Sequence, residues 1–201
     1  MCGRFENKPS IQTLVVELKK HKIDLEIDPG IDIKSELKKE NIAPTNKIFS
    51  VSHPGENYTL SLTKWGIKFS PESPLIFNSR IETIKEKKYW MTLFSKNRLL
   101  VPMSAFYEWK KEDTKKVPYR IFLPDEEIFF VPALYHIDKE KNIHTSLITT
   151  TPNKFMQPIH NRMPVILKLK DGIKFLNDNP ETNLNKCIPY TGKMDLLPSS
   201  I

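Results

Sequence analysis

The chain has 201 residues, of which 39% are hydrophobic and 27% are charged. This balance excludes a largely disordered chain, and the length suits one domain with a full hydrophobic core. No apolar run approaches the length of a membrane span, and residues 1–8 lack the apolar core of a signal peptide. We therefore expect a cytoplasmic protein.

Basic residues outnumber acidic ones, which gives a formal net charge of +7. Lysine outnumbers arginine by 26 to five, so lysine supplies the general charge and the few arginines suit forked contacts with phosphate. This charge favours a polyanionic partner such as nucleic acid without identifying one. The two cysteines, Cys2 and Cys187, would stay reduced in the cytosol, and no His/Cys spacing resembles a zinc site. We expect no disulfide, no metal and no cofactor.

Hydrophobic periodicity predicts many strands and a few helices. In chain order, we predict a helix at residues 10–21, strands at 47–52 and 57–65, a helix at 81–95, strands at 98–109, 117–123, 127–135, 143–150 and 163–167, and a short helix at 171–178. Ser10 suits the N-cap of the first helix, and residues 53–56 suit a turn between the first two strands. The pattern indicates an α+β fold, with curled sheets forming a barrel-like or sandwich core and a few flanking helices.

Cys2 is the first candidate for chemistry. The small Cys2 side chain and the following Gly3 favour removal of Met1 by an aminopeptidase, which would leave a 1,2-aminothiol at the N-terminus. A free α-amine has a pKa of about 7.7–8, so an appreciable fraction is neutral near pH 7 and can attack an aldehyde. The thiol can then add to the resulting imine and close a five-membered thiazolidine ring. A cysteine at position 2 is more often incidental, so the argument depends on the remaining motifs.

Two later segments carry groups suited to proton transfer. Glu108 is the one carboxylate within an aromatic run, where burial would raise its pKa and suit it to general acid or base catalysis. His160 and Arg162 share a face if their segment is extended, which would place a proton-transfer group beside a phosphate-binding group. The alternatives are a solvent-facing strand glutamate and a structural or merely exposed histidine.

Asn78 and Arg80 also share a face if their segment is extended. The amide and the guanidinium could then converge on one phosphate or sugar. The alternative is that Asn78 or Ser79 caps the helix that follows.

Taken together, these segments closely resemble the SOS-response-associated peptidase (SRAP) family, whose members shield abasic sites in DNA. The matching stretches, in family order, are Met1–Phe5, Asn41–Thr45, Lys64–Gly66, Asn78–Thr83, Val101–Pro102 with Phe106–Trp109, Ile148–Thr150 and Ile159–Leu167. So many separated motifs in one order are very hard to obtain by chance.

The resemblance implies an SRAP-like fold and an enzyme that forms, and later reverses, a thiazolidine crosslink between Cys2 and an abasic site in single-stranded DNA. It implies catalytic roles for Cys2, Asn78, Glu108 and His160. The residues that it places at the DNA are Arg4, Arg80 and Arg162 on phosphates, and Trp65, Pro44 and Thr149 along the channel, with Trp65 stacking on or wedging against a base. We expect a monomer that needs no cofactor and associates with the nucleoid when it is bound to DNA.

The chain departs from the family pattern at two places. Met103-Ser104-Ala105 stands where relatives usually have Ala-Asp-Gly, which suggests a different approach of this strand to DNA. The motifs end near residue 177, so we expect one domain over residues 1–201 with a poorly matched tail at 178–201, and we assign that tail no function. Cys187 is most simply a buried or incidental thiol.

Three other functions compete with crosslinking. A cysteine-type peptidase, acting on itself or on other proteins, could use Cys2 with His160 and Asn161. A non-covalent single-stranded DNA-binding module would need no reactive group. Class II glutaminase domains also begin Met-Cys-Gly, but their later His-Arg-Gly and Asn-Gly signatures are missing from this sequence.

Overall fold

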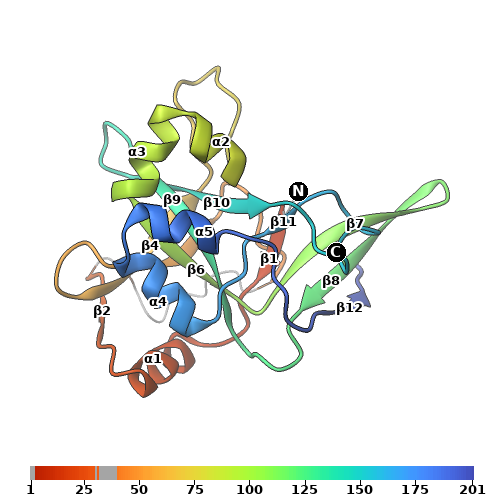
Figure 1. Cartoon of the computed structure of the whole chain (residues 1–201), viewed down its shortest axis with the longest axis horizontal. Helices are drawn as coiled ribbons and strands as arrows, with labels where there is room; N and C mark the ends of the chain where they lie inside the picture. The colour runs from red at the N-terminus through yellow and green to blue at the C-terminus, as the bar shows by residue number, and fades with distance from the viewer. Residues whose placement is uncertain (1–2, 30, 32–39) are drawn as a thin grey trace.

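The structure, a computed structural model, describes residues 3–29, 31 and 40–201 (Figure 1). Its strands are β1 (Arg4–Glu6), β2 (Leu25–Ile27), β3 (Lys47–Ser52), β4 (Tyr58–Trp65), β5 (Asn78–Arg80), β6 (Arg98–Met103), β7 (Ala105–Glu112), β8 (Lys115–Phe122), β9 (Phe129–Ile137), β10 (Ile143–Thr150), β11 (Met163–Pro164) and β12 (Asp195–Pro198). Its helices are α1 (Ile11–Lys20), α2 (Ile81–Glu86), α3 (Lys88–Lys96), α4 (Leu169–Asn177) and α5 (Pro180–Lys186).

The larger sheet closes into a barrel. Its strand order is β11-β10-β9-β6-β3-β4-β2, and β10 also pairs in parallel with β4, which places His144 opposite Lys64. That pairing joins five strands, β4, β3, β6, β9 and β10, into a ring without a free edge. The expected β-rich α+β fold with a barrel-like core is therefore confirmed.

The smaller sheet has the order β1-β7-β8-β12 and is antiparallel throughout. In Figure 1 the β7–β8 hairpin projects to the right, away from the barrel, whereas the five helices lie on the other side of the molecule. The first strand and the last strand of the chain both belong to this sheet, at its two edges.

Two predicted elements are each two elements in the structure. The predicted strand at 98–109 turns at Ser104, so β6 belongs to the barrel and β7 to the smaller sheet. Ser104 lies between them, and its N–H donates to the carbonyl of Glu6 at 2.9 Å. The predicted helix at 81–95 is interrupted at Lys87, whose extended backbone (φ −104°, ψ 117°) separates α2 from α3.

Most other predicted boundaries agree closely with the structure. Ser10 caps α1 as expected, because its side chain accepts a hydrogen bond from the N–H of Thr13. The predicted strand at 163–167 shortens to Met163–Pro164, after which Leu167 makes an isolated bridge to Phe130. The tail, for which no elements were predicted, forms α5 and β12.

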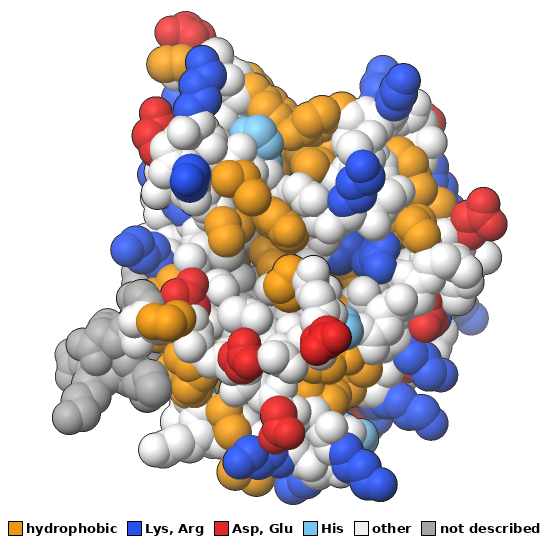
Figure 2. Space-filling model, turned by 90° about the vertical axis from the view of Figure 1, so that its left-hand side faces the viewer, with side chains coloured by type: hydrophobic (Ala, Val, Ile, Leu, Met, Phe, Trp, Pro, Cys, Tyr) orange, Lys and Arg blue, Asp and Glu red, His pale blue; other side chains and the backbone are white. Residues whose placement is uncertain are grey.

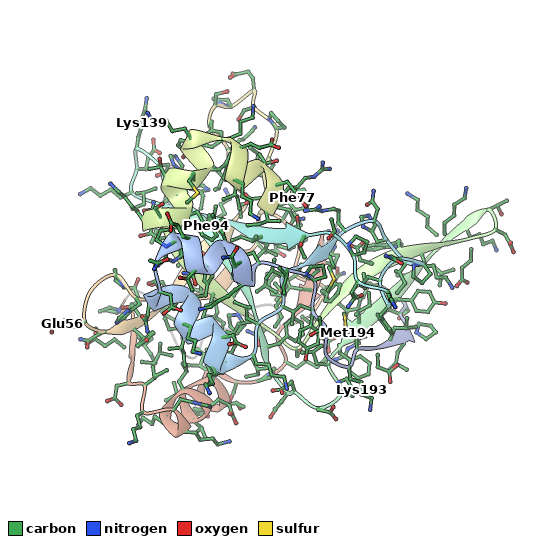
Figure 3. The ribbon with its side chains drawn as sticks, in the orientation of Figure 1. Glu56, Phe77, Phe94, Lys139, Lys193 and Met194 are labelled. Atoms are coloured by element: carbon green, nitrogen blue, oxygen red, sulfur yellow. The ribbon has the colours of Figure 1, made fainter. Side chains whose placement is uncertain are left out.

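Two hydrophobic clusters fill the molecule, and Figure 3 labels members of both. The first contains residues of the barrel and of the smaller sheet; Met194 is one of its buried members, and the partly buried Phe77 packs against the cluster. In the second, Phe94 on α3 meets Phe175 on α4 edge to face, with 5.7 Å between ring centroids. None of the described helices is both long and apolar enough to span a membrane.

Candidate functional site

The N-terminal strand runs beside the strand that carries Glu108. β1 pairs with β7 in an antiparallel register that sets Arg4 opposite Tyr107. Extending this register by one residue sets Gly3 opposite Glu108. Cys2 itself lies outside the described residues.

Glu108 is a buried carboxyl group, with 2% of its surface exposed. It lies between Tyr107 and Trp109 on β7, and burial raises its pKa to about 7, because ionisation in a poorly solvated site is unfavourable. Its Oε1 lies 4.0 Å from Nδ1 of His160. Near neutral pH the protonated and ionised forms are thus both populated, which suits a group that gives and takes protons.

His160 stands at the end of a turn that is held from both sides. Its own N–H donates to the carbonyl of Met156 at 2.9 Å, and the N–H of Arg162 donates to Nδ1 at 3.0 Å. A backbone amide can only donate, so Nδ1 accepts and the imidazole proton lies on Nε2. Burial lowers the pKa of His160 below its usual value, which favours the neutral ring.

Asn78 and Arg80 lie on the short strand β5, so their segment is extended, the condition under which they were expected to share a face. β5 pairs in parallel with β10, and the hydroxyl of Ser79 points inward to that of Ser146 at 2.7 Å. Asn78 and Arg80 therefore share the opposite face. The capping alternative does not hold, because the N-cap of α2 is Arg80 and makes no side-chain cap bond.

The three arginines expected at phosphates lie in different environments. Arg80 is exposed, and Arg4 is half-buried with its Nη1 donating to the carbonyl of Gly3 at 2.8 Å. Arg162 is 9% exposed and makes a forked pair with Glu82, both N–O distances being 2.9 Å. A phosphate at Arg162 would have to displace that carboxylate.

The three residues expected along a DNA channel also differ. Trp65 is fully buried, and its indole N–H donates to the carbonyl of Phe77 at 2.8 Å. It has no exposed face for a base, so the suggested stacking contact is incompatible with this packing. Thr149 is likewise buried, and its carbonyl accepts a hydrogen bond from Arg162 at 2.9 Å. Pro44 is half-buried and can still contact a ligand.

Sequence reasoning missed a buried ionic network that fixes β1. Glu6 is fully buried and accepts hydrogen bonds from Arg120 Nε at 2.8 Å, Tyr107 Oη at 2.7 Å and Ser104 Oγ at 3.2 Å. Burial by itself would raise the pKa of Glu6, but its hydrogen bonds to Arg120 and Tyr107 lower the pKa below the usual range. This network holds the segment that leads back to Cys2. Its partners are up to 114 residues apart in the chain, so local patterns gave no signal for it.

Cys187 is buried, as expected, and burial raises the pKa of its thiol to about 12. A thiol with so high a pKa is a poor nucleophile near neutral pH. Within the described part of the chain, no three His, Cys, Asp or Glu residues are grouped so that they could hold a metal ion.

Sequence comparisons relate the chain to known proteins. The profile of the family described as SOS response associated peptidase (SRAP) matches residues 1–198. The chain is similar to abasic site processing protein YoaM of Bacillus subtilis (30% identity over 94% of this chain and 86% of that protein). It is also similar to YoqW of the same organism (32%, 88% and 80%) and to YedK of Escherichia coli (27%, 83% and 75%), which carry the same description.

Solved structures show the same fold. A protein of Bordetella bronchiseptica matches with a TM-score of 0.80 at 16% identity, covering all of both chains. A protein of Bacteroides thetaiotaomicron matches with a TM-score of 0.75 at 23% identity, covering 98% of this chain and 91% of that one. At such identities the likeness establishes the architecture alone.

Proposed function

The chain belongs to the SOS response associated peptidase (SRAP) family, and on that premise we propose that it captures abasic sites in single-stranded DNA as a reversible covalent crosslink through Cys2. The observation that carries the proposal is the buried Glu108 beside a neutral His160, at the strand that pairs with the N-terminal segment. The names of the relatives, abasic site processing proteins, support the substrate class.

Capture begins once Met1 has been removed. The neutral α-amine of Cys2 attacks the aldehyde carbon of the ring-opened abasic sugar, the ionised form of Glu108 takes the proton that the nitrogen loses, and the Nε2–H of His160 donates to the sugar oxygen. Protonated Glu108 gives a proton to the carbinolamine hydroxyl, which leaves as water and forms the imine. The thiol then adds to the imine carbon and its proton passes to the nitrogen, so that amine, thiol and aldehyde yield one thiazolidine and one water.

Reversal follows the same steps backwards. Protonation at the ring lets the bond between carbon and sulfur break and restores the imine, and water then releases the aldehyde. Glu108 is suited to supply this proton because a substantial fraction of its carboxyl group is protonated near neutral pH.

DNA is held beside this pair by residues of β5 and of the segments next to it. Arg80 and Asn78 share one face of β5 and bind a phosphate or sugar next to the lesion, while Arg4 and Pro44 line the approach. Arg162 supports the site through its own contacts. Its backbone N–H donates to His160, and its guanidinium bridges Glu82 and the carbonyl of Thr149 on β10.

Intact-protein mass spectrometry with an abasic single-stranded oligonucleotide tests the proposal. We expect loss of Met1 and a denaturant-resistant adduct with the mass of protein plus oligonucleotide minus one water, and none with undamaged DNA. Cys2→Ala should abolish the adduct. Glu108→Gln should still form it more slowly, and should release it far more slowly to a second abasic oligonucleotide of different length.

The same experiment separates the alternatives. A non-covalent binding module would give salt-sensitive binding without an adduct. A cysteine-type peptidase acting through Cys2 would cleave itself or an added polypeptide in a Cys2-dependent way, with no requirement for an aldehyde. An adduct of equal yield on undamaged DNA would overturn the aldehyde mechanism.

A further inference from the structure

The outer half of the β7–β8 hairpin has no neighbouring strand among the described residues. β1 pairs with β7 only at residues 105–107, and β12 pairs with β8 only at 119–122. The rest of the hairpin projects as a two-stranded ribbon (Figure 1). Within residues 110–116, here called the lysine arm, four of the seven residues are lysines: Lys110, Lys111, Lys115 and Lys116.

The charges of the lysine arm are not balanced within it. Lys111 and Lys116 stand directly opposite each other in the ladder, an arrangement that is destabilising for like charges. Lys110 pairs with Glu112 at 3.2 Å, but Lys111 and Lys116 have no ion-pair partner among the residues that the structure describes. By contrast, acidic and basic side chains are interspersed on the face that Figure 2 shows.

The lysine arm starts at the site already described. Lys111 follows Glu108 by three positions on β7, about 10 Å along an extended strand, and alternation sets its side chain on the opposite face of the ribbon. On the returning strand, the charge of Lys116 adds to the effect of burial in lowering the pKa of His160, so Lys116 is near that ring as well. A DNA strand that leaves Glu108 and His160 across the unpaired edge of this ribbon thus comes close to the lysine arm.

We propose that Lys111 and Lys116 bind backbone phosphates of the DNA strand a few nucleotides from the abasic site. A polyanion between the two ammonium groups removes the repulsion that the ladder otherwise imposes on the pair. The inference rests on the proposed function for the position of the strand, although binding by the lysine arm needs no covalent chemistry.

The test compares two double variants with the same change in net charge. Lys111→Gln with Lys116→Gln alters the lysine arm, whereas Lys139→Gln with Lys141→Gln alters the turn between β9 and β10, where Figure 3 marks Lys139 at the opposite side of the molecule. Affinity for an undamaged single-stranded 15-mer is measured across a salt series, and thermal unfolding checks each fold. A third variant, Lys111→Arg with Lys116→Arg, keeps the charge.

We expect the arm variant to lower the slope of log affinity against log salt by about 1.4, since each phosphate contact on a single strand contributes about 0.7. Its affinity at low salt should fall about tenfold. The turn variant and the arginine variant should stay within twofold of the parent. Removing the like-charge pair should leave the melting temperature equal or higher.

Two outcomes would overturn the inference. Equal slopes for the arm and turn variants would mean that only overall charge matters. A parent-like slope, together with self-association of the arm variant in size-exclusion chromatography, would mean that the lysines protect unpaired strand edges from other chains. Failure of the parent to form an adduct with abasic DNA would count against the proposed function alone, because undamaged DNA is used for the slopes.

Discussion

The carboxyl group of Glu108 gives the site a pH dependence that can be measured on the fold itself. Its pKa of about 7 in the folded protein exceeds the ordinary value of 4.5, so between these two pH values the folded state binds more protons than the unfolded state. The free energy of unfolding must therefore fall as pH rises through this window. Above pH 7 the unsubstituted protein is less stable, because the buried carboxyl group of Glu108 is then mostly ionised.

Glu108→Gln should remove this dependence, because an amide of the same shape does not ionise. We expect the variant to be more stable than the parent at pH 8 by up to about 3 kcal/mol, and to differ much less at pH 5. Urea unfolding at the two pH values measures the effect. Glu127→Gln, at an exposed position, serves as the control and should follow the parent. A parent-like loss of stability from pH 5 to pH 8 in Glu108→Gln would assign the pH dependence to other groups.

At the scale of single residues, the sequence indicated a candidate site residue where one polar or charged group stood among apolar neighbours. Glu108 stood out by its aromatic neighbours, and the structure brings His160 next to it. Trp65 could not be placed in this way, because an aromatic residue suits a core as well as a binding surface, and its depth depends on Phe5 and Phe77 packing against it. Glu6 was missed for the complementary reason: its partners come from β7 and β8, far away in the sequence.

At the scale of elements, periodicity identified long strands well and turns between sheets poorly. The run from Leu99 to Tyr107 is nearly continuous in apolar residues, so it resembles one strand, and Ser104 gives little warning of the change of sheet. β1, β2 and β5 have three residues each and cannot show a period. They form because neighbouring strands offer them partners.

Gly66 is an element boundary at which the backbone requires glycine. It ends β4 with φ at +121°, and its N–H donates to the carbonyl of Thr145 at 2.7 Å. A Cβ there would lie 2.6 Å from Cδ1 of Leu75. This turn directs the chain from the barrel towards β5, so its conformation helps to position Asn78, the first residue of that strand.

Gly66→Ala should therefore destabilise the fold by roughly 2–3 kcal/mol, from backbone strain together with the clash. Chemical unfolding measures the loss. Gly55→Ala is a matched control in the exposed turn between β3 and β4, where a Cβ would meet nothing within 4 Å, and it should change stability by about 0.5 kcal/mol or less. Similar losses in both variants would show that the conformation at Gly66 is not special.

For the whole molecule, the count and spacing of strands predicted a barrel-like architecture. Which two strands pair to close the barrel could not be predicted from the sequence. The ring closes where β10 meets β4 in parallel, and these strands are about 80 residues apart with no shared pattern. The fold is nevertheless shared with proteins of 16% and 23% identity. Many different side chains can thus fill this barrel, whereas the pairings between distant strands recur.

The tail completes the smaller sheet and also supports the turn that ends at His160. β12 pairs with four residues of β8, from Tyr119 to Phe122, and Met194 is buried in the first hydrophobic cluster. Asn153 links the tail to the turn: its Nδ2 donates to the carbonyl of Tyr190 at 2.7 Å, and its Oδ1 accepts from the N–H of Met156 at 2.9 Å. The turn stabilised in this way ends at His160.

Deleting residues 193–201 should therefore affect stability and the site together. Loss of Met194 and of the β12 pairing should lower the free energy of unfolding by about 3–5 kcal/mol, comparable to a large-to-small substitution in a core. With less support the turn should become more solvated, so the depressed pKa of His160 should rise towards its ordinary value, which NMR titration of the imidazole measures. Deleting only residues 200–201, which are exposed, is the control and should leave both quantities unchanged. If the longer deletion lowers stability but leaves the pKa of His160 in place, the tail stabilises the smaller sheet without holding the turn, and His160 owes its environment to the barrel alone.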